Sequence, residues 1–262
     1  MPPFTFGDNW RSYAQGISEQ VIAQAMTSLV HLLGEEAIQD KTVIDVGCGS
    51  GLFTLAFVRL GAARVYALDV DSQCVQLTQQ LLDQEPCGQR AVVLRLSILD
   101  PALHQHLPQA DVIYAWGSLH HTGAMWRALE RATSLLLPGG LLAVALYNRH
   151  WASPFWRWVK RFYNSCPATV QTGLVRGYFY LGQTYNALTR RQVALQRGME
   201  VIHDIQDWLG GLPYEYASPG EVQAFAKRQA WDIVRMIPCQ GMTGCNEFVL
   251  RRPQPCDTHA SV

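Results

Sequence analysis

Three closely spaced glycines near residue 50 constrain the fold more than any other stretch of this chain. An apolar run at 43–46 predicts a buried strand, and helical apolar spacing follows at 52–60. Between the two stand Gly47, Gly49 and Gly51. Because glycine has no Cβ, it allows a sharp turn and a close approach of a ligand to the backbone. The free N–H groups of the helix start would face a polar or anionic ligand group, so the stretch predicts a nucleotide-type cofactor site.

The spacing of these glycines discriminates between cofactors. A dinucleotide fingerprint, G-x-G-x-x-G, would need a glycine at position 52, where Leu52 stands. The spacing is instead G-x-G-x-G, and an acid, Asp45, lies two residues before the first glycine. In this respect the stretch resembles the first motif of the class I S-adenosylmethionine-dependent methyltransferases, and later stretches fit that family in order. An NAD-binding oxidoreductase is one alternative, and a non-catalytic partner-binding protein on the same fold is another.

The resemblance implies an α/β fold, a Rossmann-like doubly wound sheet of seven strands. A helical aromatic and basic insertion after the fifth strand is expected from the composition and is not explained by the resemblance. The resemblance covers residues 43–147 by motif and 217–251 by topology. The expected organisation is an N-terminal helical lid segment at 1–40, a cofactor-binding core at 41–148, a helical cap or substrate insertion at 149–216, the C-terminal part of the core sheet at 217–252 and a loose tail at 253–262.

Hydrophobic periodicity predicts alternating strands and helices in the order of a doubly wound sheet. An amphipathic helix is expected at 17–33, after the aromatic residues Trp10 and Tyr13, which the family resemblance makes candidate lid residues. The turn Pro138-Gly139-Gly140 should precede the fifth strand. Further strands are expected at 64–68, 91–96, 111–115, 141–147, 231–236 and 246–250, and further helices at 71–82, 124–136 and 218–229.

A second cofactor contact is expected at Asp69, which ends the second strand. A carboxylate can accept hydrogen bonds from both hydroxyls of a ribose, and NAD enzymes use an acid in the same way. At the third strand the family commonly has an acid for the adenine amino group, whereas Ser97 stands here. By resemblance, the residues expected to bind S-adenosyl-L-methionine, and its product S-adenosyl-L-homocysteine, are Asp45, Gly47, Cys48, Gly49, Gly51, Asp69, Val70, Ser97, Ile98, Trp116 and Gly117.

Two histidines are candidate general bases. His120 lies in the loop after the fourth strand, where ligands of open α/β sheets bind, and His203 lies among polar residues near the end of the insertion. A histidine that titrates near neutral pH suits proton transfer. The alternative for each is a structural one, packing for His120 and helix capping for His203. A base is needed only if the acceptor is protonated.

The insertion has an unusual composition. Between Glu130 and Glu200 there is no acidic residue, but there are nine basic ones and many aromatic ones. The stretch 154–163 predicts a helix with Arg157, Lys160 and Arg161 close together on one side. A cap over the substrate with solvated cations is the favoured interpretation. A peripheral membrane contact through 151–163 and a site for an anionic substrate are alternatives.

Composition limits the remaining possibilities. The net charge is zero, which disfavours nucleic acid as a partner. Seven cysteines without a C-x-x-C pair indicate reduced thiols and no metal site. The chain lacks a secretion signal and a membrane-spanning stretch, so a cytoplasmic protein is expected, peripheral on a membrane in one alternative. The expected function is methyl transfer from S-adenosyl-L-methionine to O, N, C or S of a small-molecule or lipid-like acceptor, with the oligomeric state left open.

Overall fold

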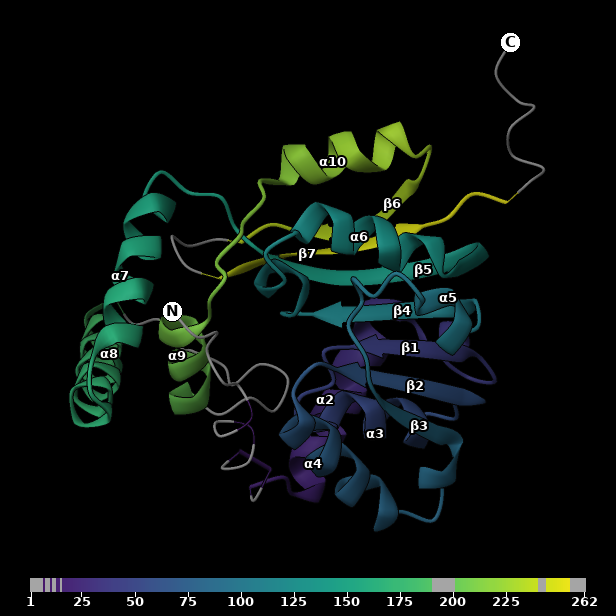
Figure 1. Ribbon diagram of the computed structural model, residues 1–262, viewed down its shortest axis with the longest axis horizontal. Helices are drawn as coiled ribbons and strands as arrows, with labels where there is room; N and C mark the ends of the chain where they lie inside the picture. Colours follow the sequence, from purple (N-terminus) through teal and green to yellow (C-terminus); the bar gives the residue numbers. More distant parts are fainter. Residues whose placement is uncertain are drawn as a thin grey trace.

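A sheet of seven strands lies at the centre of the computed structural model, which describes residues 7, 10, 13, 14, 16–189, 201–239 and 244–254. The strand order is β3-β2-β1-β4-β5-β7-β6 (Figure 1). The first five strands are parallel, and β7 runs antiparallel to both of its neighbours. The predicted fold class is therefore confirmed. The strands are β1 (Thr42–Val46), β2 (Arg64–Asp69), β3 (Ala91–Arg95), β4 (Ala110–Trp116), β5 (Leu136–Tyr147), β6 (Asp232–Ile237) and β7 (Cys245–Arg251).

Helices cover both faces of the sheet. Along β1, Val43 packs in one apolar cluster while Ile44 and Val46 pack in the other, because successive strand residues point to opposite faces. One face is covered by α2 (Glu19–Leu33), α3 (Leu52–Arg59) and α4 (Ser72–Asp83), and the other by α5 (Leu103–His106), α6 (Met125–Ser134) and α10 (Pro219–Arg228). Three short 3₁₀ turns, η1 (Glu35–Ala37), η2 (Gly88–Arg90) and η3 (Leu119–His121), complete the connections.

The insertion after β5 forms a separate helical group. It consists of α7 (Ser153–Ser165), α8 (Ala168–Thr189) and α9 (Val201–Gly210), which stand beyond the end of the sheet toward which β4 points (Figure 1). These helices share an apolar cluster of their own with Tyr147, the last residue of β5. The insertion thus adjoins the carboxyl ends of the strands, the edge where open α/β sheets bind ligands.

The fifth strand starts earlier than its sequence predicts. Leu136 pairs with Ala110, and regular pairing resumes only at Leu141 with Val112. Between these pairs the register shifts, and Gly139 has a φ of 79°. The Pro-Gly-Gly sequence therefore makes an irregularity inside β5 rather than a turn before it, because the buried Leu136 already joins the sheet.

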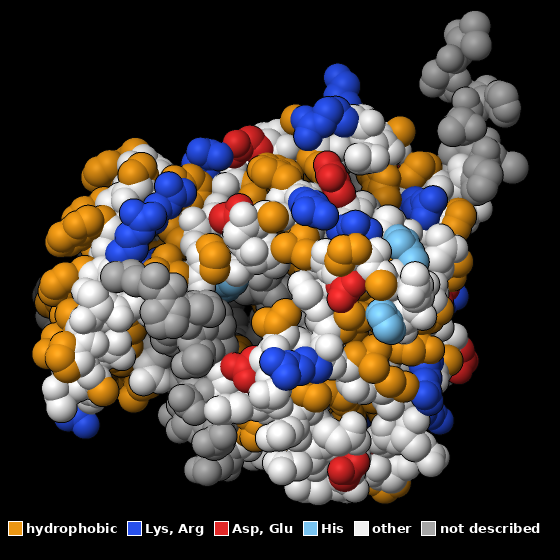
Figure 2. All heavy atoms as spheres, viewed as in Figure 1, with side chains coloured by type: hydrophobic (Ala, Val, Ile, Leu, Met, Phe, Trp, Pro, Cys, Tyr) orange, Lys and Arg blue, Asp and Glu red, His pale blue; other side chains and the backbone are white. Residues whose placement is uncertain are grey.

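Helix α7 presents its basic residues differently from the prediction. Arg157 and Arg161 are exposed, whereas Lys160 is completely buried. The expectation that the cations of this helix stay solvated is wrong for Lys160, because it falls on the inner stripe with Trp156 and Tyr163, at spacings of four and three residues. The outer side of the insertion shows apolar side chains around a row of basic side chains (Figure 2).

The N-terminus of α10 is closed by a capping box. The Ser218 side chain accepts from the backbone N–H of Glu221, whose carboxylate in turn accepts from the N–H of Ser218 at 2.8 Å. Pro219 begins the helix. Each contact satisfies a donor that the helix itself leaves unpaired.

Replacing Ser218 by Ala should lower the free energy of unfolding by about 1 kcal/mol, because one N-cap acceptor is lost. Urea unfolding at an unchanged m value measures this. Thr27→Ala is the matched control, since the Thr27 hydroxyl only donates to the Ala23 carbonyl within exposed helix. An equal loss in both variants would contradict the capping role.

Candidate functional site

The glycine turn after β1 has a backbone that other residues adopt rarely. Gly47, Gly49 and Gly51 have φ values of 79°, 56° and 83°. The N–H groups of Gly47 and Cys48 both donate to the carbonyl of Leu68, at 2.7 and 3.0 Å. A Cβ on Gly47 would come within 2.4 Å of the Ser118 Cβ. The turn is thus held between the ends of β2 and β4 and leads directly into the N-terminus of α3.

Asp69 lies at the end of β2 and braces this turn. Its carboxylate accepts from the N–H of Gly49 at 3.0 Å and from the N–H of Asp71 at 2.9 Å. Burial raises the pKa of Asp69 above its ordinary value. A carboxylate has about four lone-pair positions, so the two backbone contacts leave acceptor capacity for ribose hydroxyls.

Asp45 and Cys48 support the turn from the protein side. Asp45 is 2% exposed and accepts from the Thr54 hydroxyl on α3 at 2.6 Å. Burial raises the pKa of Asp45 to about 7. The Cys48 thiol is buried and accepts from the Thr78 hydroxyl at 3.4 Å. The hydrogen bonds of Asp45 and Cys48 go to the helix residues Thr54 and Thr78. Contact of these two side chains with the cofactor stays a prediction.

The predicted adenine contacts follow β2 and β3. Val70 is 64% exposed although it is apolar, and it directly follows the acid of β2. Ile98 is buried, and the Ser97 hydroxyl accepts from the N–H of Leu99 at 3.1 Å. An exposed valine offers an apolar surface to a flat ring, while the roles of Ser97 and Ile98 remain predictions.

Trp116 ends β4 and Gly117 follows it, beside the turn. The Trp116 ring stacks on Tyr114, with centroids 5.5 Å apart and planes inclined by 10°. Gly117 has a φ of 73°, and no atom of the described residues lies within 4 Å of the position of a Cβ there. The space in front of Gly117 is therefore open to a ligand.

Described residues of the N-terminal segment lie over the turn. The Trp10 ring comes within 3.1 Å of the position that a Cβ on Gly49 would take. Tyr13 is buried beside Trp10, and the Gly7 N–H donates to the Asp71 carboxylate at 3.1 Å. The role of this segment as a lid stays a prediction.

His120 is packed tightly at the carboxyl end of β4. It is 1% exposed, and its Nδ1 accepts from the backbone N–H of Tyr147 at 3.3 Å. Burial lowers the pKa of His120 well below its ordinary value, so the ring is neutral. Its catalytic role stays a prediction.

The neighbouring His121 forms a hydrogen bond through Nδ1 with the Pro213 carbonyl at 2.8 Å. His203 falls in α9, and its side chain lies outside the described part of the structure.

A buried lysine next to these residues escaped sequence reasoning. Lys160 Nζ lies 4.4, 4.9 and 5.2 Å from the ring centroids of Trp208, Tyr214 and Tyr147, and it donates to the Trp208 carbonyl. Burial lowers the pKa of Lys160 to about 7, although the charge of Asp207 acts in the opposite direction. The helical spacing of Lys160 from the aromatic residues Trp156 and Tyr163 is the sequence signal that indicates its burial.

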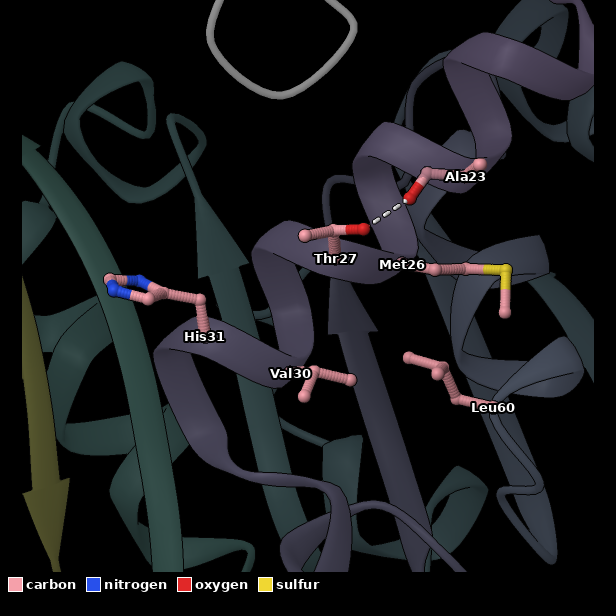
Figure 3. A pocket seen from close by; sticks show the side chains of 6 residues that line it. All are labelled: Ala23, Met26, Thr27, Val30, His31 and Leu60. Carbon is pink, nitrogen blue, oxygen red and sulfur yellow. Dashed lines mark hydrogen bonds between the residues drawn. The ribbon is translucent and has the colours of Figure 1, made fainter.

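Other features of the described residues do not add a site. No group of three or more His, Cys, Asp or Glu side chains is placed to hold a metal ion in the described ranges. No described helix has the length and apolarity needed to cross a membrane. An open groove of about 500 Å³ shares no residue with the predicted site, and its Thr27 hydroxyl bonds back to the Ala23 carbonyl (Figure 3). The groove is lined by Ala23, Met26, Thr27, Val30, His31 and Leu60.

Comparison with known sequences gives a family match over most of the chain. The family model described as “Methyltransferase domain” matches residues 17–211. The ribosomal protein L11 methyltransferase of Acinetobacter baylyi is 37% identical over 113 residues, which are 43% of this chain and 36% of the relative. That of Legionella pneumophila is 50% identical over 95 residues, 35% of this chain and 32% of the relative. The aligned parts thus span about a third of these relatives.

Solved structures share the fold at low sequence identity. Magnesium protoporphyrin IX methyltransferase from Synechocystis with bound S-adenosylhomocysteine has a TM-score of 0.57 at 13% identity, covering 94% of this chain and 93% of the other. An N-methyltransferase from Bradyrhizobium japonicum has a TM-score of 0.51 at 14% identity, covering 90% and 99%. These similarities concern the fold.

The comparisons correct the expected acceptor. The relatives are named for a ribosomal protein as acceptor, which overturns the expectation of a small-molecule or lipid-like acceptor. The alternative of a peripheral membrane contact through 151–163 depends on a lipid-borne acceptor, so it is overturned together with that expectation. The family match likewise overturns the alternatives of an NAD-binding oxidoreductase and of a non-catalytic partner-binding protein.

The buried His120 predicts a loss of stability in acid. The unfolded chain binds a proton as pH falls below about 6.5, whereas the buried neutral ring does not, so the folded state loses about 1 kcal/mol between pH 6.5 and 5.5. Urea unfolding of parent and His120→Gln at several pH values measures this. The variant should show a weaker pH dependence, and the exposed-site control His106→Gln should match the parent. Identical pH dependence in parent and His120→Gln would contradict the assignment.

Proposed function

Because the chain belongs to the methyltransferase domain family, we propose that it transfers the methyl group of S-adenosyl-L-methionine to a protein acceptor of the ribosomal-protein kind. The observation that carries this proposal is the glycine turn braced by Asp69, which lies beside the open space at Gly117. S-adenosyl-L-homocysteine is the other product. We assign the reaction to the cytoplasm, where thiols stay reduced, in agreement with the free thiols of Cys48, Cys74, Cys87 and Cys166.

The order of the strands supports the proposed cofactor position. The predicted contacts follow β1, β2, β3 and β4, which are neighbours in the order β3-β2-β1-β4. Their carboxyl ends therefore form one continuous edge. We assign the adenine to Val70, Ser97 and Ile98 and the ribose to Asp69. The methionine portion then extends across the glycine turn toward Trp116 and Gly117, next to the acceptor side.

The chain's own residues contribute mainly binding and orientation. The sulfonium of the cofactor supplies the activated methyl group, so the protein must hold the acceptor atom in line and exclude water. The N–H groups at the start of α3 face the cofactor's polar end. Trp10 over Gly49 shields the same position from solvent.

The outer side of α7 fits a protein as acceptor. On α7, Phe155, Trp158 and Phe162 are exposed, and Arg157 and Arg161 lie among them; Trp151, two residues before the helix, is exposed as well. Trp158 stacks on Phe162 with ring centroids 5.8 Å apart. Large aromatic residues and arginine are enriched where proteins contact each other. This surface lies on the insertion that adjoins the carboxyl edge of the sheet.

Asp69→Asn should weaken S-adenosylhomocysteine binding at least about tenfold, because a charge-assisted hydrogen bond to the ribose is lost. Isothermal titration calorimetry measures the Kd, and circular dichroism confirms the fold. Asp83→Asn is the matched control on exposed helix, where the carboxylate meets Gln79 at 2.7 Å. Parent-like affinity in Asp69→Asn would remove the ribose assignment.

The acceptor is tested with purified ribosomal protein L11 and S-adenosylmethionine. We expect release of S-adenosylhomocysteine and a gain of one or more methyl masses on the acceptor. Gly47→Ala should abolish turnover, since its Cβ would meet Ser118. If the parent binds S-adenosylhomocysteine but leaves L11 unmodified, the acceptor is wrong and the cofactor assignment stands.

A further inference from the structure

Lys160 is an unusual residue to find completely buried. Its ammonium group faces the rings of Trp208, Tyr214 and Tyr147 at 4.4 to 5.2 Å from their centroids. Aromatic faces carry partial negative charge and attract cations, and three rings around one ammonium form a cage of the kind that binds alkylammonium ligands. The three rings come from different elements, since Tyr147 ends β5, Trp208 lies in α9 and Tyr214 follows it.

The cage is joined to the cofactor turn by a short path of contacts. The ring centroids of Tyr147 and His120 are 3.8 Å apart. Two residues before His120, the Ser118 hydroxyl donates to the Val46 carbonyl at 2.6 Å, where the glycine turn begins. The cage therefore lies on the acceptor side of the same sheet edge.

Two further groups in this cluster lack partners. Within the described part of the chain, the buried indole nitrogens of Trp156 and Trp208 have no hydrogen-bond acceptor, and the two rings lie 5.5 Å apart. A buried donor without a partner is destabilising, so its retention points to a ligand that supplies acceptors. The carbonyl groups of a peptide segment are such acceptors.

We propose that Tyr147, Trp208 and Tyr214 form the recognition site for the cationic amino group of the protein acceptor, and that Lys160 fills this site as an internal substitute. The inference rests on the proposed function, because a protein offers lysine and N-terminal ammonium groups. The incoming amine gives a proton to water, its nitrogen forms the bond to the methyl carbon, and the C–S bond of the sulfonium breaks. Each methylated product remains a cation that the rings can hold.

Entry of the acceptor requires that Lys160 leave the cage, since the side chain is fully buried. The near-neutral pKa of Lys160, lowered by burial to about 7, makes this departure easier, because the charge that the rings attract is partly lost at neutral pH. Asp207 and Cys245 act in the opposite direction and raise the pKa of Lys160, and the charge of Lys160 in turn lowers the pKa values of the buried His120 and of His121.

The cage is tested without cofactor by emptying it. Lys160→Ala leaves a space for tetramethylammonium chloride, and Lys160→Met keeps the space filled. We expect a rise in the thermal midpoint with tetramethylammonium for Lys160→Ala alone, compared with sodium chloride at equal concentration. The neutral 2,2-dimethylpropan-1-ol should give no comparable rise. Equal responses in all three proteins, or to the alcohol and the cation, would overturn the proposal.

The aromatic wall is tested in the emptied protein. The double variant Lys160→Ala with Tyr214→Phe keeps the aromatic ring and should keep its affinity for tetramethylammonium. In the double variant Lys160→Ala with Tyr214→Leu the ring is lost, so the affinity for tetramethylammonium should fall at least about tenfold. Equal tetramethylammonium affinities in the two double variants would mean that the cavity is merely apolar, and would overturn the cage. If Lys160→Ala does not fold alone, tetramethylammonium must restore its thermal transition where sodium chloride does not, and failure to do so counts against the cage.

The acceptor role is separated from the proposed function by kinetics. With ribosomal protein L11 as acceptor, Tyr214→Leu should raise the KM for L11 while Tyr214→Phe leaves it unchanged, and both should keep the parent Kd for S-adenosylhomocysteine. Equal KM values in the two variants would overturn the acceptor role of the cage. A parent that leaves L11 unmodified would instead overturn the proposed acceptor, whatever the cation binding shows.

Discussion

The hydrogen bonds between the glycine turn and the end of β2 determine the geometry of the whole cofactor edge. Two consecutive N–H groups, of Gly47 and Cys48, share the Leu68 carbonyl, and the next residue of β2, Asp69, holds Gly49. The turn is thereby attached to the neighbouring strand rather than only to its own helix. Ser118 completes the arrangement from β4 by donating to Val46. Three strands thus position a backbone that contains almost no side-chain atoms of its own.

Lys160 shows how a site can tolerate a group that folding disfavours. Taking an ammonium out of water is unfavourable, and the three rings offset part of this penalty through their negative faces. The same rings belong to the apolar cluster that holds α7 and α9 to the end of β5. The contact between the insertion and the core therefore includes the Lys160 ammonium group surrounded by aromatic rings. Such an attachment responds to charge, whereas a purely aliphatic contact would not.

Sequence patterns predicted the parts of the molecule that depend on local chemistry. The glycine turn and the buried strand before it need particular residue types at fixed spacing, so they can be predicted without knowledge of a tertiary partner. The start of β5 was misplaced, because Pro138 and two glycines suggest a turn even where Leu136 has already joined the sheet. Lys160 was assigned to a solvated face by its charge, although its spacing from Trp156 and Tyr163 places it inside. Its cage was out of reach, because Tyr147 and Trp208 meet it only through the tertiary fold.

The antiparallel position of β7 has a consequence for how this chain acquires its site. β7 lies between β5 and β6, so the long apolar β5 keeps one unpaired edge until the strand at 245–251 has been synthesised. Such an edge is open to pairing with other chains. The same pairing secures Tyr147 opposite Cys245, at the end of β5 where the aromatic cluster begins. Completion of the sheet and formation of the aromatic cluster therefore both depend on the synthesis of β7, and a chaperone that shields β5 would act on both.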